Sequence, residues 1–334
     1  SLNWTKLYAD WLTRDLPRGG CALSCDLPEH PALYGEGWAR AMETLLPLGG
    51  AAQVQKMLHT LVDVSAQAQL APGRLARSVS LGGRVTQVGG ERESAQFVAL
   101  VHQTLLWSGD RAFAEDMLPV TGLCIHYLRR TTRSFEDIQP DLVEDVRAAL
   151  VGQTYILHLT GADDTAIRTL IEKLPAQAEQ SEENMTLAQQ AMRCGEEAHI
   201  GRMIGKLGQM VHTAAPGLPG SIRTEDAAPG VLLQASAGYG LVRTVFNSLF
   251  GIRPDAGKKE IFWHPHTPIG WEGWQIENVK IGGDLFNVKS ERVSPSQARY
   301  TLTTDGQGWR VKTMENGEIK ETEVNGELSL VMED

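Results

Sequence analysis

Glu36 is the first residue whose type and surroundings could support chemistry. It lies between Gly35 and Gly37, directly before an apolar run, in the stretch PALYGEGWARAMETLLPLGG (31–50). A carboxylate is favoured at the start of a helix, because the free N–H groups and the helix dipole there attract negative charge. This position suits a catalytic acid and a structural carboxylate equally well, so both interpretations stay open at this point.

The residues after Glu36 predict the helix that positions it. Apolar side chains recur there at the spacing of one helical face, and a Gly-Gly pair follows as the expected end. The face consists of Trp38, Met42, Leu45 and Leu46. We therefore expect Glu36 at or just before the first turn of this helix.

Helical spacing continues through the first three quarters of the chain. It predicts helices over residues 54–62, 97–108, 111–130, 141–160, 164–178, 200–211 and 231–250. Several helices end alike, in apolar residues followed by a glycine that can adopt the left-handed C-cap conformation. These glycines are Gly49, Gly109, Gly161 and Gly251. The recurrence indicates helical hairpins around a common core, and the absence of a short fixed repeat favours a closed array over an open solenoid.

The pattern changes to β after Pro254. Short, partly alternating runs follow, separated by turns rich in Gly, Asn and Asp. They cover residues 260–264, 274–281, 285–293, 298–304, 309–314, 318–324 and 327–332. We therefore expect a mainly α protein, with a helical domain over 1–253 and a small antiparallel β domain over 254–334.

Composition limits the classes of partner. The net charge of −10 and the pI near 5.4 argue against nucleic acid or an anionic membrane. No apolar run reaches the roughly 18 residues that a membrane helix needs. Four cysteines are too few for a disulfide scaffold, which favours a reduced, cytoplasmic setting.

Known cofactor and metal motifs are missing from the sequence. It contains no P-loop, no dinucleotide fingerprint and no G-x-S-x-G elbow, so no cofactor is expected. Cys21 and Cys25 form a C-x3-C pair near His30, but no second pair of metal ligands accompanies them. No metal site is predicted.

Three segments resemble the six-hairpin glycosidase superfamily, the (α/α)6 toroids that include amylo-α-1,6-glucosidase-like and glucoamylase-like enzymes. GIRPDAG (251–257) is similar to the segment that closes the toroid, and HTPIGW (266–271) to the run that opens the C-terminal β domain. The stretch 92–119 resembles a hairpin of the family that begins with ETPQF. The resemblance implies an (α/α)6-toroid-like helical array and a glycoside hydrolase that acts on an α-linked oligosaccharide with inversion.

Inverting hydrolysis needs two carboxyl groups about 6.5–9.5 Å apart, one to protonate the leaving oxygen and one to activate water. The resemblance implies Glu36 as the acid and Glu225 as the base, with Asp226 as the second choice for the base. Gln234 matches the family's QAWS segment, and Glu93 matches the glutamate of ETPQF, where it would grip a sugar hydroxyl.

Trp38 has two interpretations. An apolar sugar face could stack on its ring, as in many carbohydrate sites. Its place in the apolar face of the predicted helix favours a core position instead.

Two departures from the family pattern support a rival interpretation. Gly37 occupies the position of the family's acidic residue, and the tryptophan of QAWS is missing. The chain could then be a catalytically inactive carbohydrate-binding or subunit-interaction relative, or a purely structural helical scaffold. Fewer helices are recognised than six hairpins need, so a second copy of the chain or a partner chain could complete the toroid.

Overall fold

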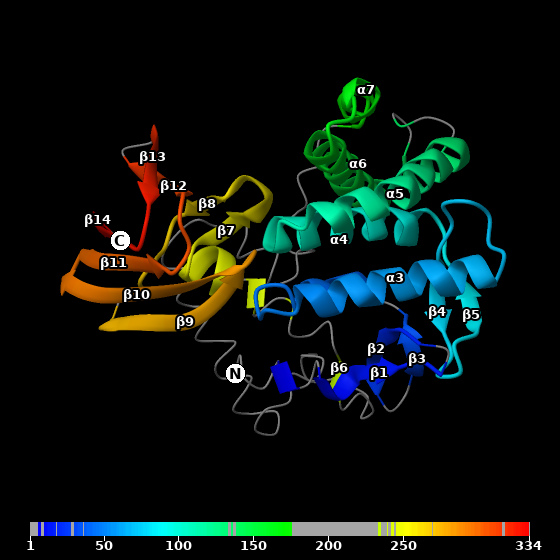
Figure 1. Cartoon of the computed structure of the whole chain (residues 1–334), viewed down its shortest axis with the longest axis horizontal. Helices are drawn as coiled ribbons and strands as arrows, with labels where there is room; N and C mark the ends of the chain where they lie inside the picture. Colours follow the sequence, from blue (N-terminus) through cyan, green and yellow to red (C-terminus); the bar gives the residue numbers. More distant parts are fainter. Residues whose placement is uncertain are drawn as a thin grey trace.

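The computed structural model describes most of the chain. It covers residues 6–7, 10–17, 19–27, 30–35, 37–132, 135, 138–175, 233–234, 239, 242–243, 245–268, 270–315 and 318–333. A helical region lies on one side of the molecule and a β sandwich on the other (Figure 1). None of the described helices has the length and apolar character to cross a membrane.

The helical region is built around α4. Its helices are α2 (Trp38–Glu43), α3 (Ala51–Gln67), α4 (Glu91–Ser108), α5 (Arg111–Thr131), α6 (Pro140–Thr160) and α7 (Thr165–Glu172). Helix α4 packs against α2, α3, α5 and α6, and α6 also packs against α7. The helices predicted over 97–108, 111–130 and 141–160 are confirmed.

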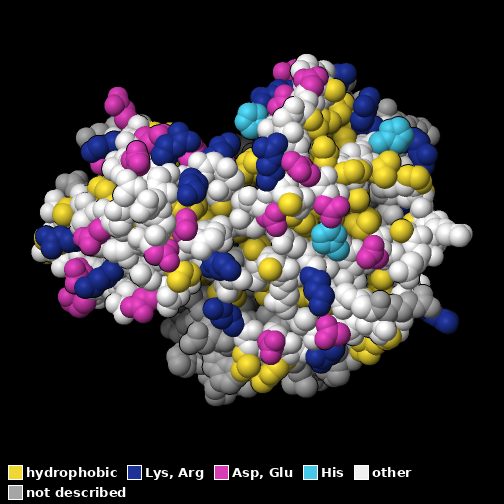
Figure 2. Space-filling model, viewed as in Figure 1, with side chains coloured by type: hydrophobic (Ala, Val, Ile, Leu, Met, Phe, Trp, Pro, Cys, Tyr) yellow, Lys and Arg dark blue, Asp and Glu magenta, His cyan; other side chains and the backbone are white. Residues whose placement is uncertain are grey.

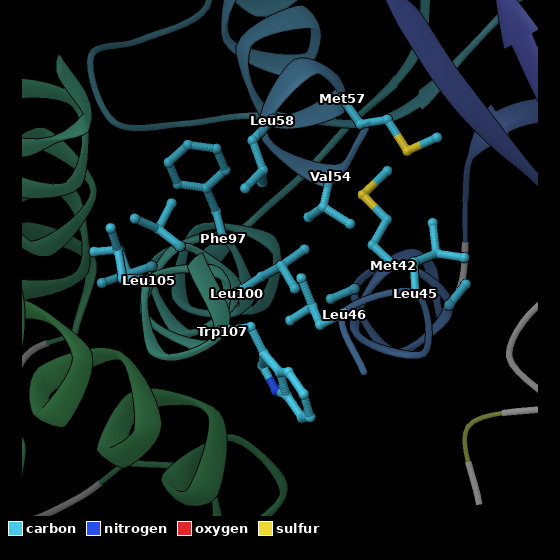
Figure 3. Close-up of a cluster of buried hydrophobic side chains, with 14 of the residues drawn as sticks. Met42, Leu45, Leu46, Val54, Met57, Leu58, Phe97, Leu100, Leu105 and Trp107 are labelled. Carbon is cyan, nitrogen blue, oxygen red and sulfur yellow. The ribbon is translucent and has the colours of Figure 1, made fainter. Parts of the chain in front are cut away.

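The core between α2, α3 and α4 follows the apolar spacing of the sequence. Figure 3 shows the side chains of the three helices and of the turn after α2 pointing toward one another. They include Met42, Leu45, Leu46, Val54, Met57, Leu58, Phe97, Leu100 and Leu105, none more than 4% exposed. Each fully buried side chain of this kind contributes about 1.5–3 kcal/mol of transfer free energy.

Two of the predicted helix ends are confirmed, because Gly109 and Gly161 are the C-caps of α4 and α6. Helix α2 already ends at Glu43, before Gly49, and the element described before Gly251 is a π-helical turn over Val245–Leu249. Gly49, Gly109, Gly161 and Gly251 all have positive φ angles, from +62° to +87°. Helix α7 is shorter than predicted, because it ends at Glu172 and not near residue 178. A proline three residues later disfavours helical conformation in the residue before it, which accounts for the earlier end.

A six-stranded antiparallel sheet in the N-terminal part was not predicted. Its strands are β1 (Thr13–Asp15), β2 (Cys21–Leu27), β3 (His30–Tyr34), β4 (Ala76–Val79), β5 (Val85–Val88) and β6 (Leu233–Gln234). Strands β1 to β5 lie in chain order, and β6 pairs with β2. They are short and lack clean alternation, so the apolar pattern of the neighbouring helices dominates the sequence signal.

The prediction of one helix over 231–250 is wrong. The described residues of that stretch include strand β6 and a π-helical turn over Val245–Leu249. Pairing with β2 decided the conformation of Leu233 and Gln234, and tertiary contacts of this kind override local propensity. The helix predicted over 200–211 lies outside the described residues.

The β sandwich confirms the strands predicted after Pro254. One sheet has the order β14-β11-β10-β9 and the other β13-β12-β8-β7. The strands are β7 (Ile252–Asp255), β8 (Glu260–Trp263), β9 (Gly273–Ile281), β10 (Asp284–Ser294), β11 (Gln297–Thr304), β12 (Trp309–Glu315), β13 (Glu318–Val324) and β14 (Glu327–Glu333). Strand β7 spans Pro254, so the boundary predicted before this residue falls inside a strand.

Buried aromatic rings form the sandwich core. The ring of Trp309 packs edge-on against Phe286, with 4.9 Å between the ring centres. Its indole N–H donates a hydrogen bond of 2.7 Å to Asp284 Oδ2, so this polar atom is satisfied. Trp263 is also fully buried.

A series of aromatic rings joins the two regions. Trp107 at the end of α4 contacts Phe246, which contacts Phe250, and Phe250 contacts Trp274 on β9. Ring centres in this series are 5.0–6.1 Å apart. Trp107 is 8% exposed, so its ring lies in the core.

Polar contacts join the same two regions. The hydroxyl of Tyr155 on α6 donates a 2.6 Å hydrogen bond to Asp255 Oδ1, and Lys258 Nζ lies 2.8 Å from Asp255 Oδ2. Burial and the adjacent Asp255 carboxylate raise the pKa of the Tyr155 hydroxyl, so it keeps its proton and remains a donor. The end of β7 is thereby tied to the middle of the helical region.

Candidate functional site

A cavity of about 650 Å³ lies where α2, α4 and α6 begin. Three parts of the chain far apart in the sequence supply its walls. They are the residues around the start of α2 (Gly35, Gly37, Trp38 and Arg40), Arg77 with the start of α4, and the start of α6. Pro140 is the first residue of α6, a position that tolerates proline because its missing N–H would have no partner in the helix. The cavity therefore collects side chains from the first turns of neighbouring helices.

The cavity wall carries charges of both signs. Its guanidinium groups are those of Arg40, Arg77 and Arg92, and its carboxyl groups are those of Glu91, Glu93, Asp141, Glu144 and Asp145. Five carboxyl groups and three guanidinium groups leave an excess of two negative charges when all are ionised. The wall thus offers many hydrogen-bond donors and many acceptors to a ligand.

Arg92 links α4 to α6 across the cavity. Its Nη2 pairs with Asp141 Oδ2, and its Nε lies 3.3 Å from Asp145 Oδ2. Gln96 Nε2 donates to Asp145 Oδ1 at 3.4 Å. Asp141 and Asp145 are four residues apart on α6, which places them on one helical face.

The environment of Asp145 on this wall changes its proton affinity. Burial raises its pKa, and the nearby side chains of Gln96, Arg92 and Arg40 offset part of that rise. Its side chain is 28% exposed, so a ligand in the cavity can reach it. A carboxyl group with a raised pKa is suited to donate a proton.

Glu93 lines the cavity but also begins helix α4. Its Oε2 accepts a 2.7 Å hydrogen bond from the backbone N–H of Gly90, as the glutamate of a capping box does. Its Oε1 lies 3.7 Å from Arg77 Nε, and the side chain is 13% exposed. The structure therefore gives Glu93 a capping role, and its predicted contact with a sugar hydroxyl stays a prediction.

Trp38 lies beside the cavity with its ring in the core. The residue is 1% exposed, and its ring packs edge-on against Tyr34 with 6.0 Å between centres. This burial favours the core interpretation, and the predicted stacking of a sugar on Trp38, which lines the cavity, stays a prediction. Within the described residues, its indole Nε1 is buried without a hydrogen-bond partner.

The predicted catalytic residues lie outside the described part of the chain. This holds for Glu36, Glu225 and Asp226, while Gln234 is described only through the backbone of β6, paired with Asp26 of β2. The two neighbours of Glu36, Gly35 and Gly37, both line the cavity. Gly37 has a φ of +76° and precedes the first residue of α2, as predicted for the helix start.

The sequence predicts no metal site. Among the described residues, no group of three or more His, Cys, Asp or Glu side chains is arranged to hold a metal ion. Cys21 is buried and free, and burial raises the pKa of its thiol. A thiol of this kind is a poor ligand and a poor nucleophile at neutral pH.

Sequence reasoning missed Arg40, Arg92, Asp141 and Asp145. A signal for the last two was present, because aspartates in the first turns of a helix after a proline are typical of a helix start. That signal is equally typical of helices without a ligand. Only the packing of α4 against α6 brings these residues together.

The fold is shared with solved carbohydrate-active enzymes. The chain is similar to an α-L-rhamnosidase of Streptomyces avermitilis in complex with L-rhamnose, with a TM-score of 0.63 and 12% identity over 99% of this chain and 41% of that one. An α-L-rhamnosidase of Dictyoglumus thermophilum gives a TM-score of 0.67 and 10% identity over 93% of this chain and 47% of that one. A protein from the human microbiome, described as a kojibiose phosphorylase, gives a TM-score of 0.50 and 9% identity over 88% of this chain and 60% of that one.

No family model and no curated protein matches the chain. The chain spans less than half the length of the two rhamnosidases. At 9–12% identity the likeness concerns the fold. The helical region followed by a β domain is thus an arrangement found in enzymes of the glycoside hydrolase type.

Proposed function

We propose that the chain is a glycoside hydrolase-like protein that binds a sugar in the cavity at the start of α2, α4 and α6. The observation that carries the proposal is this cavity, lined by charged groups of both signs, in a fold shared with glycosidases. Sugar hydroxyls both donate and accept hydrogen bonds, so carboxyl and guanidinium groups on one wall suit them. The excess of carboxyl groups favours a neutral sugar over an acidic one.

The proposed reaction is hydrolysis of an α-linked oligosaccharide with inversion. Glu36 is the proposed acid, because its two neighbours line the cavity. Glu225 is the proposed base, with Asp226 as the second choice, on the family resemblance alone. Asp145 is a further candidate acid on the described wall, because its pKa is raised and its side chain remains reachable.

The helices α2 to α7 are proposed to belong to an (α/α)6 toroid. Their alternating hairpins, with helix starts gathered at one cavity, support this arrangement. A second copy of the chain or a partner chain could complete it. Size-exclusion chromatography with light scattering tests this part of the proposal, and a stable monomer would count against completion by another chain.

Turnover of a defined substrate panel tests the reaction. The panel consists of maltose-like oligosaccharides and an aryl α-L-rhamnoside, and NMR identifies the anomer formed first. Glu225→Gln should abolish turnover while leaving the melting temperature unchanged. Glu272→Gln, at an exposed position ahead of β9, is the matched control and should behave as the wild type. Unchanged turnover in Glu225→Gln would contradict its role.

A catalytically inactive sugar-binding relative is the second candidate. The conformation of Gly37 favours it, because this residue takes the family's acidic position and adopts a left-handed conformation before α2. Calorimetry separates the two candidates. Sugar binding without turnover of any panel member would support the second.

A further inference from the structure

A second polar cluster lies one turn further along α2. It consists of Glu43, Tyr239 and Arg243. Tyr239 follows Glu43 by 196 positions in the sequence. The Tyr239 hydroxyl lies 3.5 Å from Glu43 Oε1, and Arg243 Nη1 lies 3.7 Å from the same oxygen. The Arg243 guanidinium also contacts the Tyr239 hydroxyl and lies 5.4 Å from the centre of its ring.

This cluster lies one helical turn from the cavity wall along α2. Arg40 lines the cavity, and Glu43 follows it by three residues, which places both on one side of α2. The Arg40 guanidinium acts electrostatically on the Asp145 carboxyl in the cavity and on the Glu43 carboxyl outside it. Arg40 is therefore near enough to influence both carboxyl groups electrostatically.

The cluster keeps hydrogen-bonding capacity for a ligand. The contacts of Glu43 at 3.5 and 3.7 Å are at or beyond the upper limit for direct hydrogen bonds. Within the described residues, Arg243 Nε is buried without a hydrogen-bond partner. The side chains of Glu43 and Arg243 are 26% and 35% exposed, so both can be reached from solvent.

The charge state of the cluster is set by its environment. Burial raises the pKa of the Glu43 carboxyl, and Arg243, Tyr239 and Arg40 offset part of that rise. Burial and the Glu43 carboxylate raise the pKa of the Tyr239 hydroxyl to about 12, so it stays protonated. The cluster thus presents one acceptor, one hydroxyl and one guanidinium to the same space, a set that matches adjacent sugar hydroxyls.

We propose that Glu43, Tyr239 and Arg243 form a second sugar subsite, which holds the unit next to the one in the cavity. This inference rests on the proposed function of the cavity. The ligand class is a neutral oligosaccharide of at least two units. The first unit contacts the cavity wall, and the second places hydroxyl groups against the exposed sides of Glu43 and Arg243.

Calorimetry on the full chain tests the subsite with two pairs of sugars. Each pair has a monosaccharide and a disaccharide: glucose with maltose, and L-rhamnose with rutinose. Arg243→Gln should weaken disaccharide binding about tenfold and leave monosaccharide binding unchanged, because charged hydrogen bonds to the second unit are lost. Tyr239→Phe, which keeps the ring, should weaken disaccharide binding about threefold.

Two further variants separate the possible outcomes. Asp145→Asn in the cavity should weaken binding of monosaccharide and disaccharide alike. Arg253→Gln is the matched control, because this arginine of β7 stacks on Phe262 of β8 and its replacement should leave all affinities unchanged. The melting temperature of each variant is measured, and Tyr239→Phe provides the test if Arg243→Gln does not fold.

The outcomes distinguish the subsite from the cavity. If the wild type binds sugars but neither subsite variant changes the ratio of disaccharide to monosaccharide affinity, the cluster is structural and the inference is overturned. If both pairs of sugars fail to bind the wild type, the proposed function fails and the subsite with it. Selective loss of disaccharide binding supports the subsite.

Discussion

The cavity wall and the β sandwich use charged side chains in different ways. Over the sandwich, acidic and basic side chains are interspersed on the visible face (Figure 2). Arg310 and Lys312 pair there with Glu260, and Arg310 lies 3.4 Å from Glu321. Such ion pairs on the outer face of a sheet contribute little to stability, typically about 0–1 kcal/mol each.

Arg292 shows how the sandwich uses a charge to hold its backbone. Its Nη2 donates to the carbonyl oxygens of Thr267 and Pro268, both at 2.9 Å, and its Nε donates to that of Trp271 at 3.2 Å. These donors fix the loop between β8 and β9. At the cavity, by contrast, Arg40 is exposed on the wall.

The difference separates stability from function. Charged side chains of the sandwich pair with one another or hold its loops through hydrogen bonds. Charged side chains at the cavity lie at helix starts, where a ligand can reach them. Variants in the sandwich should therefore change the free energy of unfolding and leave sugar affinity alone. Variants at the cavity should change affinity and pH dependence more than stability.

Trp309→Ala in the sandwich should have the largest effect on stability. It removes a ring that is 1% exposed, its contact with Phe286 and the hydrogen bond to Asp284. We expect a loss of about 3–5 kcal/mol in the free energy of unfolding, measured by urea denaturation. Ile319→Ala, at a residue that is 63% exposed, is the control and should cost less than about 0.5 kcal/mol. A reduced sugar affinity in the folded Trp309→Ala protein would break the comparison.

Gly251→Ala, where the helical region meets the sandwich, should come next. This residue has a φ of +65°, and an added Cβ would lie 2.0 Å from the carbonyl oxygen of His264. We expect a loss of about 3 kcal/mol from strain and displacement of the backbone. Gly161→Ala is the matched control, because its φ is +78° but nothing lies within 4 Å of an added Cβ. Strain alone should cost about 1 kcal/mol there, and equal losses in the two variants would refute the effect of crowding.

Tyr155→Phe should have a smaller effect and tests the polar link between the regions. It removes the 2.6 Å hydrogen bond to Asp255 and keeps the ring. A hydrogen bond to a charged group contributes about 1.5–3 kcal/mol, and we expect a loss near the lower end of this range. Thermal unfolding followed by calorimetry measures the loss. No change in stability would show that the aromatic series alone joins the two regions.

Asp145→Asn at the cavity should have the smallest effect on stability and a distinct pH dependence. The pKa of Asp145 is raised in the folded protein, so the folded state holds its proton more tightly than the unfolded chain does. Stability therefore falls as pH rises from the ordinary pKa of an aspartate, about 4, through the raised value. The stability of the variant should therefore decrease less over this pH range, because the contribution of Asp145 is gone. The remaining decrease comes from Glu43, whose pKa is also raised.

Urea denaturation from about pH 4 to neutral pH measures this difference. Asp63→Asn on α3 is the control, because this carboxyl does not line the cavity. Parallel pH profiles for the wild type and Asp145→Asn would contradict the prediction.

The sequence predicted the elements whose signal is local. The helices around 97–108, 111–130 and 141–160, the helix ends at Gly109 and Gly161 and the strands after Pro254 are confirmed, because their periodicity and turn residues span only a few positions. It missed the N-terminal sheet, because strands as short as β1 and β6 carry almost no periodic signal, and β6 forms only by pairing with the distant strand β2. It also left Trp38 with two interpretations, a sugar-stacking ring or a core ring, and only its packing against Tyr34 in the folded chain favours the core.

The sequence by itself determined the order of a helical region and a β region, and where most of their helices and strands begin and end. The tertiary structure alone decided which charged groups meet. Arg92 reaches Asp141 across 49 residues, and Tyr239 reaches Glu43 across 196. A local pattern records the neighbours of a residue along the chain. The cavity wall and its adjoining cluster arise from helix packing, which joins residues that no local pattern connects.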